Sequence, residues 1–521
     1  MTDFNIADLF EKVADAIPDR EALVCGDRRL TYRELDERAT RLAHVLAAHG
    51  VRAGDHVGLH LYNSTEYLEG MIAAFKLRAV PINVNYRYVA DELRYLFNDA
   101  ELKVAIHEPG FAELIDAIRD DVPTLQWTVA RGDDYERELA AASAERDFEP
   151  RSGDDLYILY TGGTTGMPKG VMWRQDDVFV AAFGGAGVSS DDEVVERVAA
   201  GRTRCLPACP FMHGTAHWMA FSTFFGGGTV VVSPGAHMDP AAIWQLIADE
   251  NVTFLVIVGD AFARPLVDAL DPDPEARPDL TSLGAILSGG AILSPAVKDA
   301  LIERLPGVIV VDGYGASETG GQGQMVAAPG ASAGARPRFM VGPDTQVVDD
   351  DLRPVDPGSG VIGRVARRGR VPLGYFKDEA KTAATFPTID GERWAVPGDL
   401  AMVEADGTVT LLGRGSVSIN TGGEKVFPEE VESALKSHPS VFDAVVVGVP
   451  DDRWGQRVTA VVSLRRNAGQ PTLEELADHC RTSIAGYKVP RSLAIVDSIV
   501  RSPSGKPDYR WARSEAEKQL A

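Results

Sequence analysis

The segment at residues 160–170 carries the residue types best suited to chemistry in this sequence, in the order YTGGTTGMPKG. It follows an apolar run, 156–160, that is typical of a buried strand. Its glycines let the backbone approach a ligand closely, and its hydroxyls, backbone N–H groups and one ammonium, on Lys169, can meet negative charge. Together these groups suit a polyphosphate. A flexible connector is the alternative, but connectors rarely end in a fixed Pro-Lys-Gly sequence.

Single residues exclude three familiar motifs. A Walker loop needs Ser or Thr directly after Gly-Lys, whereas Gly170 follows Lys169, which itself follows a proline. Residues 313–318 carry Glu318 where a dinucleotide-binding fingerprint needs its third glycine. Ser317 is not in a nucleophile elbow, because residue 319 is threonine rather than glycine. Hydride transfer and serine hydrolysis therefore lose their best candidate motifs.

The elements around these motifs predict a mostly parallel sheet covered by helices. Ligands bind beyond the carboxyl ends of the strands in such sheets. Two polar, glycine-rich segments, 288–291 and 312–320, directly follow predicted strands, so we expect both at the ligand site. The alternating pattern comprises strands at 229–232, 253–258, 284–287 and 308–311, and helices at 240–249, 261–270 and 295–304.

The rest of the chain indicates an α/β protein of two domains. A βαβ unit is predicted near the N-terminus, and its helix at 31–50 begins with a Thr31–Glu34 capping box. Short β segments after residue 342 indicate a β-rich subdomain, and a new helix-and-strand pattern begins at Pro428. We predict a large N-terminal domain at 1–413 and a small, mobile α+β C-terminal domain at 414–521, with a hinge at 413–416.

Length, charge and cysteine content narrow the class of protein. The 521 residues exceed the roughly 250–300 that one hydrophobic core usually serves. A formal charge of −24 and a pI near 4.9 argue against nucleic-acid and anionic-membrane partners, so local cations must meet any anionic cofactor. Four cysteines make no disulfide framework, and no signal peptide or membrane span is visible. We therefore expect a cytoplasmic protein without integral membrane contact.

Residues 189–217 give two weaker signals. An acidic, polar stretch at 189–196 is predicted to be an excursion at the surface. Cysteines and histidines then recur every four residues, which on one continuous helix would align four zinc ligands. Two prolines would interrupt such a helix, so a zinc site is not expected. The residues concerned are Cys205, Cys209, His213 and His217, with Pro207 and Pro210 between them.

Residues 164–173, TTGMPKGVMW, together with the segments 312–320 and 501–506, resemble the adenylate-forming superfamily of acyl-CoA synthetases, nonribosomal-peptide adenylation domains and luciferases. Within it, the loop is most similar to that of actinobacterial fatty-acid and steroid-side-chain CoA ligases. The resemblance implies an ATP-dependent ligase that converts a hydrophobic carboxylate into acyl-AMP and pyrophosphate, after which CoA displaces AMP. The implied cofactors are ATP, Mg2+ and coenzyme A.

The resemblance also implies which residues bind the phosphates and the metal. Ser317 would touch the α-phosphate, and Glu318 with Thr161 would hold Mg2+, an ion that prefers hard oxygen donors. The β- and γ-phosphates would be bound by Thr164, Thr165, Gly166 and Lys169.

The base and ribose would be bound by residues of the later segments. Tyr314 matches the aromatic residue that stacks on adenine, with Gly313 and Gly315 letting the ring approach. Asp399 matches the carboxylate that accepts hydrogen bonds from the ribose, beside the basic Arg414. The predicted nucleotide contacts are completed by Gly289, Ala291 and Asp312.

Lys506 matches the superfamily's C-terminal catalytic lysine, which would stabilise charge on the α-phosphate and carboxylate oxygens. Glu318 and Thr165 are the other residues given catalytic roles by the resemblance. His213 resembles a residue beside the acyl carboxylate, and a buried structural histidine is the alternative. The acyl pocket is expected between residues 211–225, 258–262 and 289–291, where glycines at 184, 185, 187 and 226–228 would leave room for a bulky apolar group.

The superfamily turns its C-terminal domain between two half-reactions. The second orientation would present four residues to the CoA thiol, namely Thr421, Gly422, Gly423 and Glu424. Ser416 and Val417 depart from the acidic residues usual after Gly-Arg at the hinge, although a hinge needs only to absorb backbone change.

Three other functions stay open. The enzyme could load a carrier protein, although no carrier domain follows in the sequence and no carboxylate near His213 offers to hold an α-amino group. Luciferase-like oxidation shares the same motifs. A nucleotide-binding regulator without turnover would not need both Lys169 and Lys506. A homodimer is compatible with the sequence.

Overall fold

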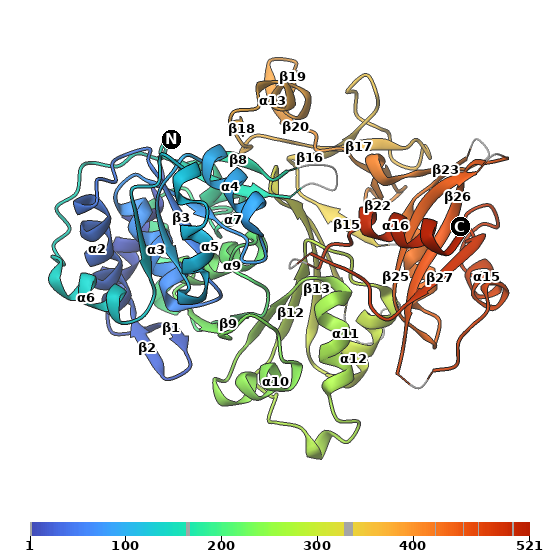
Figure 1. Ribbon diagram of the computed structural model, residues 1–521, viewed down its shortest axis with the longest axis horizontal. Helices are drawn as coiled ribbons and strands as arrows, with labels where there is room; N and C mark the ends of the chain where they lie inside the picture. The colour runs from blue at the N-terminus through green and yellow to red at the C-terminus, as the bar shows by residue number, and fades with distance from the viewer. Residues whose placement is uncertain are drawn as a thin grey trace.

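The computed structural model describes residues 3–162, 167–327, 337–421, 424–451, 453–466, 468–502 and 505–520. These residues form four β-sheets with helices packed against them, from the N-terminal layers at the left of Figure 1 to a separate C-terminal sheet at the right. Among the described helices, none is both long and apolar enough to cross a membrane.

The first layer is a parallel sheet in the order β4-β3-β5-β6. The predicted helix at 31–50 is confirmed as α2 (Tyr32–Ala48), where Thr31 and Glu34 each accept the other's backbone N–H in a capping box. The layer comprises β3 (His56–His60), β4 (Val80–Asn83), β5 (Leu102–His107) and β6 (Trp127–Ala130), with α3 (Thr65–Lys76), α4 (Ala90–Asp99), α5 (Ala112–Asp116) and α6 (Asp133–Ala141).

The largest sheet has a parallel half whose strands pair in the order β13-β12-β11-β9-β10-β1. The predicted strands and helices of this region are confirmed, and β9 is an addition. Its strands are β1 (Glu21–Cys25), β9 (Arg204–Pro207), β10 (Thr229–Val232), β11 (Phe254–Ile257), β12 (Ala285–Gly289) and β13 (Ile309–Ala316), and its helices are α10 (Pro240–Asp249), α11 (Gly259–Ala269) and α12 (Pro295–Arg304).

The β-rich region continues this sheet instead of forming a separate one. β14 pairs antiparallel with β13, and β15 joins β14 to β22, so the strands of residues 338–414 extend the same sheet. β2 (Arg28–Thr31) closes the opposite edge. The antiparallel strands are β14 (Gly320–Ala327), β15 (Arg338–Val341), β16 (Thr345–Val348), β17 (Gly363–Arg368), β19 (Thr388–Ile389), β20 (Glu392–Ala395), β21 (Asp399–Val403) and β22 (Val409–Arg414), with α13 (Glu379–Thr385) beside them.

The glycine-rich segment joins two strands of a small antiparallel sheet. β7 (Leu156–Thr161) pairs with β8 (Lys169–Arg174), which places Thr161 opposite Lys169, and β18 (Gly374–Tyr375) pairs with β8 on the other side. α7 (Gln175–Ala182) follows β8, and α9 (Gly214–Phe225) packs nearby. The stretch at 189–196, expected as an excursion at the surface, is mostly exposed or half-buried, and most of it belongs to a helix that the sequence pattern did not indicate. α8 (Asp191–Ala200) forms there, because Ser190 caps it and Val194 and Val198 give it an apolar face.

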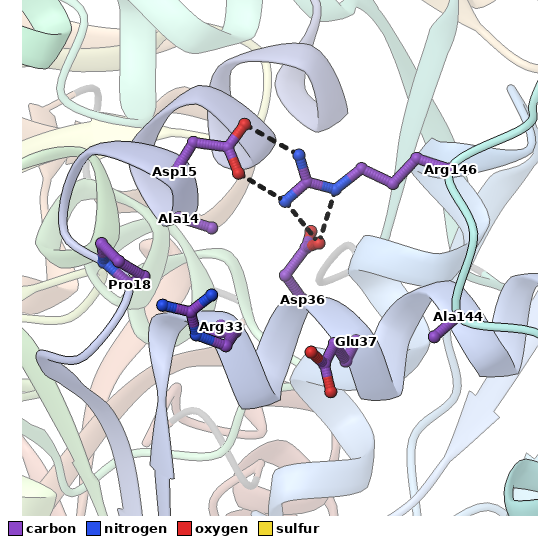
Figure 2. A pocket seen from close by; sticks show the side chains of 8 residues that line it. All are labelled: Ala14, Asp15, Pro18, Arg33, Asp36, Glu37, Ala144 and Arg146. Atoms are coloured by element: carbon purple, nitrogen blue, oxygen red, sulfur yellow. Dashed lines mark hydrogen bonds and ion pairs between the residues drawn. The ribbon is translucent and has the colours of Figure 1, made fainter.

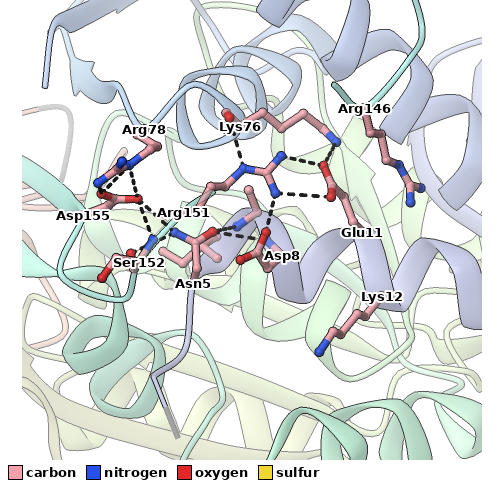
Figure 3. A network of polar contacts seen from close by, with 12 residues as sticks. Asn5, Asp8, Glu11, Lys12, Lys76, Arg78, Arg146, Arg151, Ser152 and Asp155 are labelled. Carbon is pink, nitrogen blue, oxygen red and sulfur yellow. Dashed lines mark hydrogen bonds and ion pairs between the residues drawn. The ribbon is translucent and has the colours of Figure 1, made fainter. Parts of the chain in front are cut away.

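The first helix, α1 (Ile6–Ala16), is tied to the irregular segment 142–155 by ion pairs (Figure 3). Arg151 pairs with Asp8 and, at 2.9 Å, with Glu11. The side chain of Lys76 is fully buried, and its ammonium lies 2.6 Å from Glu11. We call these ion pairs the N-terminal clamp. They hold α1 through the side chains of Lys76 and Arg151, which lie much later in the sequence than α1.

A second arginine of the same segment closes a surface hollow between α1 and α2 (Figure 2). Arg146 bridges Asp15, at 2.9 Å, and Asp36, at 2.8 Å. No predicted site residue lines this hollow, so we assign its charged groups to the packing of α1.

The C-terminal sheet is separate and buries an apolar layer on each face. α14 and α15 cover one face through residues such as Val431 and Leu476, and α16 covers the other through Ala512 and Ala516. The predicted boundary at 413–416 lies between β22 of the large sheet and the first strand of this one, and it stays a prediction. The elements are β23 (Ile419–Thr421), β24 (Glu424–Val426), β25 (Val441–Asp451), β26 (Gly455–Leu464), β27 (Ser492–Val496), α14 (Pro428–Lys436), α15 (Leu473–Arg481) and α16 (Tyr509–Leu520).

Candidate functional site

Tyr314, Asp399 and Arg414 come from three strands of the large sheet and share one hydrogen-bond network. The Tyr314 hydroxyl donates to Asp399 Oδ2 at 3.0 Å, and Arg414 Nε donates to Asp399 Oδ1 at 3.1 Å. Asp399 and Arg414 stand opposite each other on β21 and β22. Burial, and then the charge of Asp399, raise the pKa of Tyr314, so its hydroxyl keeps its proton. The carboxylate is thereby held in one orientation, with lone pairs left for a diol such as ribose.

The glycine after Tyr314 is required by backbone packing. A Cβ on Gly315 would lie 2.3 Å from the carbonyl oxygen of Gly320 on the neighbouring strand. Gly313 is less crowded, with its nearest neighbour, Leu287, at 3.3 Å. Gly315 thus lets β13 and β14 meet closely at a point where the register between them shifts.

Two residues of the β7–β8–β18 sheet hold the turn that carries Ser317 and Glu318. The Tyr375 hydroxyl donates to Glu318 Oε1 at 2.8 Å, and Trp173 Nε1 donates to the carbonyl oxygen of Ser317 at 3.0 Å. Thr161 ends β7 in the same sheet. The structure therefore ties the sheet bearing the glycine-rich segment to the turn that follows β13.

The donor set fits a magnesium ion that is shared with phosphates. Among the described residues, no group of three or more His, Cys, Asp or Glu side chains could hold a metal by itself. Mg2+ usually takes one or two protein oxygens and completes its shell with water and substrate phosphates. The Glu318 carboxylate and Thr161 hydroxyl are donors of this kind.

Lys506 brings the C-terminal part of the chain to this site. Lys506 as a whole is exposed to solvent. Burial and the charge of Arg414 lower the pKa of Lys506, while Glu318 and Asp399 act in the opposite direction. Groups from segments almost two hundred positions apart are thus close enough for their charges to interact.

His213 lies near Lys506 with an uncharged ring. Burial lowers the pKa of His213 to about 3, and Lys506, His217 and Arg87 act in the same direction. Its Nε2 is buried without a hydrogen-bond partner among the described residues. A neutral imidazole with an unpaired nitrogen suits an oxygen of a bound acid or phosphate.

His217, in contrast, belongs to a satisfied structural network. Its Nε2 accepts from the Tyr157 hydroxyl at 2.5 Å, its Nδ1 donates to the carbonyl oxygen of Phe211 at 2.7 Å, and Trp218 donates to Tyr157 at 2.9 Å. Cys205 lies on strand β9, not on a helix with His217. In the part of the chain that the structure describes, no group of three or more His, Cys, Asp or Glu side chains is placed to hold a metal ion.

Lys169 is paired with Asp378, a carboxylate that sequence reasoning did not single out. Lys169 is the first reason that the pKa of Asp378 is lowered. Both side chains keep substantial exposure, so this ion pair can exchange for a phosphate. The other predicted members of the loop, Thr164, Thr165 and Gly166, lie outside the described residues.

Asp312 has a structural role that competes with nucleotide binding. Its carboxylate lies 3.0 Å from the ammonium of Lys298 on α12, and both side chains are nearly inaccessible to solvent. Gly289, the last residue of β12, pairs with Gly313 within β13, and Ala291 follows two residues later. The end of β12 places 289–291 at the carboxyl edge of the sheet, as predicted.

One face of α9 borders accessible space in the region where the acyl pocket is expected. Four residues spaced along this face are half-buried, whereas their neighbours in the helix are mostly buried, so they border accessible space: Thr215, Trp218, Met219 and Ser222. A Cβ on Gly290 would lie 3.2 Å from the Thr215 hydroxyl, and one on Gly184 would lie 2.7 Å from the Ser222 hydroxyl. The face therefore extends from the strand ends of the site to the α7–α8 connection.

Most of the glycines expected to leave room in this pocket serve close packing instead. A Cβ on Gly227 would lie 2.3 Å from the carbonyl oxygen of Val198, and one on Gly228 would lie 2.5 Å from that of Thr203. Gly187 is the exception, with no atom within 4 Å of a built Cβ. These glycines, apart from Gly187, therefore do not provide the space that was expected of them.

The described residues predicted for the CoA thiol belong to the C-terminal sheet. Thr421 and Glu424 face each other across the β23–β24 hairpin, and Thr421 also pairs with Gly455 on β26. Gly422 and Gly423 lie outside the described residues. Tyr375, Asp378 and Lys298 were missed in the sequence, because none belongs to a motif and each acts through a partner distant in the chain.

Comparison with known proteins agrees with this arrangement. The family of AMP-binding enzymes matches residues 10–376, and the AMP-binding enzyme C-terminal domain matches residues 430–506. The 3-oxocholest-4-en-26-oate–CoA ligase of Rhodococcus rhodochrous is 48% identical, over 98% of this chain and 96% of its own length. A medium/long-chain-fatty-acid–CoA/3-oxocholest-4-en-26-oate–CoA ligase of Mycolicibacterium smegmatis is 47% identical, over 99% of this chain and 97% of its own length.

Solved structures give the same result. The anthranilate CoA ligase AuaEII in complex with anthranoyl-AMP superposes with a TM-score of 0.85 at 25% identity, covering 99% of this chain and 98% of that one. ATP-bound MatB from Rhodopseudomonas palustris superposes with a TM-score of 0.84 at 27% identity, and the match covers 99% of this chain and 100% of that one. With a family match over most of its length and close relatives over nearly all of it, the chain belongs to the AMP-binding enzymes of the adenylate-forming superfamily.

Proposed function

We propose that this enzyme is an ATP-dependent acyl-CoA ligase for a hydrophobic carboxylic acid. In the first step a carboxylate oxygen attacks the α-phosphorus of ATP, which forms acyl-AMP and releases pyrophosphate. In the second step the CoA thiol attacks the acyl carbon, which forms the thioester and releases AMP and a proton. The observation that carries the proposal is the meeting of Lys506 with Glu318, Asp399, Arg414 and His213.

Each of these groups has a task in the first step. Asp399, oriented by Tyr314 and Arg414, accepts hydrogen bonds from the ribose. Lys506 stabilises the negative charge that builds on the α-phosphate and carboxylate oxygens. His213 donates to or accepts from the acid without adding a second positive charge beside Lys506.

A magnesium ion, held by Glu318 and Thr161, would neutralise phosphate charge when bound. Lys169 would exchange Asp378 for a phosphate oxygen. Because the whole protein carries a charge of −24, these local cations are what lets a polyphosphate enter the site.

The acid is proposed to be bulky and apolar, in the range from medium-chain fatty acids to steroid acids. The relatives named for such acids support this range, and so does the wall formed by Trp218 and Met219 on α9. We also propose a cytoplasmic enzyme, since Cys25, Cys205, Cys209 and Cys480 are all free thiols.

The test is a panel of carboxylates from short fatty acids to steroid acids, incubated with ATP, Mg2+ and either CoA or a phosphopantetheinylated carrier protein. Mass spectrometry should detect acyl-CoA for the bulky apolar acids, with AMP and pyrophosphate in equal amounts. Acyl transfer to the carrier alone would favour the carrier-loading function. The absence of pyrophosphate with every acid would favour a nucleotide-binding regulator and contradict the proposal.

The role of Lys506 gives a sharper test. Lys506→Ala should slow acyl-AMP formation by about 100- to 1000-fold, the usual effect of removing one group that stabilises transition-state charge. ATP binding and the reaction of preformed acyl-AMP with CoA should stay close to wild type. Lys518→Ala is the control, because Lys518 is an exposed lysine of the same C-terminal region. Equal losses in both half-reactions would contradict the assigned role.

A further inference from the structure

A buried ion pair joins the large sheet's helix α11 to helix α14 of the C-terminal part. The ammonium of Lys436 lies 3.0 Å from Asp260 Oδ2, and the two side chains are only 4% and 6% exposed. Asp260 is in the first turn of α11, and Lys436 is the last residue of α14. α11 lies on the side of the large sheet nearest the C-terminal sheet (Figure 1).

Asp260 is fixed and charged on its own side of this contact. Its Oδ1 accepts the backbone N–H of Ser294 at 2.7 Å, and Arg264 lies 3.9 Å from Oδ2. Burial alone would raise the pKa of Asp260, but Lys436 and Arg264 more than compensate, so that the pKa lies below its ordinary value. A carboxylate so enclosed depends on the cation that reaches it from α14.

The same turn of α11 receives the loop that carries Lys506. A Cβ on Gly505 would lie 3.1 Å from both the carbonyl oxygen of Val258 and the Cβ of Ala261, the residues that flank the first turn around Asp260. Arg501 links this loop to β25. It donates one hydrogen bond of 2.9 Å to the carbonyl oxygen of Gly505 and two hydrogen bonds of 2.7 Å to the carboxylate of Asp443.

We propose that the Asp260–Lys436 pair holds the loop that carries Lys506 next to the network of Tyr314, Asp399 and Arg414. The pair is needed for acyl-AMP formation but not for transfer to CoA. This inference rests on the proposed function. Asp260 and Lys436 touch neither substrate nor cofactor, and so they are positioning residues. Both α14 and the loop that carries Lys506 are held to β25, the loop through the bonds of Arg501 to Asp443. A rotation of the C-terminal part that carries Lys506 away from Arg414 would therefore also separate Lys436 from Asp260.

The experiment measures the two half-reactions separately in Lys436→Met and Asp260→Asn, using the full chain and the acid that the wild type accepts. Single-turnover formation of acyl-AMP should slow about 10- to 100-fold in each variant, in the range typical of coupling across buried charge pairs. Transfer from preformed acyl-AMP to CoA should keep its rate or rise. The double variant should be no slower in acyl-AMP formation than the slower single variant, since both remove one interaction.

Lys488→Met is the matched control. Lys488 pairs with Glu430 at 2.6 Å, both side chains are largely buried, and Glu430 is also on α14, but this pair lies within the C-terminal part. Its loss should not slow acyl-AMP formation more than CoA transfer. Lys436→Arg keeps the charge and should restore much of the rate, which a purely structural role in packing volume would not predict.

Three outcomes would overturn the proposal: equal slowing of both half-reactions by Lys436→Met, equal slowing of acyl-AMP formation by Lys488→Met, or additive losses in the double variant. Should Lys436→Met fail to fold, Asp260→Asn decides alone, because an asparagine can still accept the Ser294 N–H. Failure of the proposed function is distinguishable, since the wild-type enzyme itself would then form no acyl-AMP.

Discussion

Gly505 stands where the lysine loop meets the first turn of α11, one residue before Lys506. Its φ is +73°, a conformation that costs a residue with a side chain about 1–2 kcal/mol. A methyl group there would also lie 3.1 Å from the carbonyl oxygen of Val258 and from Ala261, so that one side must yield by a few tenths of an ångström. Gly505→Ala must therefore distort the loop or lift it from α11.

We expect Gly505→Ala to slow acyl-AMP formation about 10- to 100-fold. The backbone strain alone would reduce the population of the loop conformation that contacts α11 by about 5- to 30-fold. Displacing the ammonium from its reacting position adds to this, because small misplacements of catalytic groups reduce rates steeply. The assay is single-turnover acyl-AMP formation by rapid quench, beside transfer from preformed acyl-AMP to CoA, which should stay at the wild-type rate.

Gly391→Ala separates strain from contact. Gly391 has a φ of +81°, yet no atom lies within 4 Å of a built Cβ, and the residue belongs to the β19–β20 hairpin. This variant should lose thermal stability and keep its rate of acyl-AMP formation. The reasoning is refuted if Gly505→Ala forms acyl-AMP at the wild-type rate, or if Gly391→Ala is slowed to the same extent.

Two further predictions concern stability. Lys298→Met leaves the buried Asp312 without its partner at 3.0 Å and should reduce the free energy of unfolding by about 3–5 kcal/mol, measured by chemical denaturation; an unchanged denaturation midpoint would contradict it. Burial, and then His107, lower the pKa of His60 to about 3. As pH falls, His60 therefore binds a proton in the unfolded chain before it does so in the native state. Through His60, the free energy of unfolding decreases by up to about 1.4 kcal/mol per pH unit below about pH 6.5. In the wild type, the His60 and Phe111 rings are stacked with their centroids 4.2 Å apart, and a phenylalanine ring can keep this contact. His60→Phe should therefore reduce the pH dependence of the free energy of unfolding between about pH 6 and 4. The same pH dependence in variant and wild type would contradict this prediction.

Local patterns predicted much of the fold, because the forces that form these elements act over short stretches. The alternation between 229 and 311 gave the parallel strands, and Thr31 with Glu34 marked the start of α2. α8 was missed because only Val194 and Val198 of its ten residues are buried, so its polar composition hid the apolar face. The continuity of β13 with β14 also escaped, since antiparallel pairing across a glycine-rich turn leaves no periodic signal.

Candidate site residues could be singled out where a motif carries its own chemistry and not where a distant partner completes it. The glycine-rich segment 312–320 stood out by its composition, and the resemblance to the superfamily then assigned roles to Tyr314 and Glu318. The ion pairs of Lys169 with Asp378 and of Asp312 with Lys298 depend on which helices and strands pack together. The meeting of Lys506 with Arg414 likewise follows from how the C-terminal sheet is placed, for which spacing along the chain holds no information.

The N-terminal clamp has a consequence for synthesis on the ribosome. α1 is among the first segments to emerge, but the arginine that meets Asp8 follows it by 143 positions. At the usual rate of translation of about 5–20 residues per second, the nascent helix waits roughly 7–30 s for that arginine. During this time Phe10 can already pack against Tyr32 of α2, but not against Phe224 of α9, which lies beyond residue 151. We therefore expect the apolar face of α1 to stay incompletely covered until the middle of the chain has been synthesised.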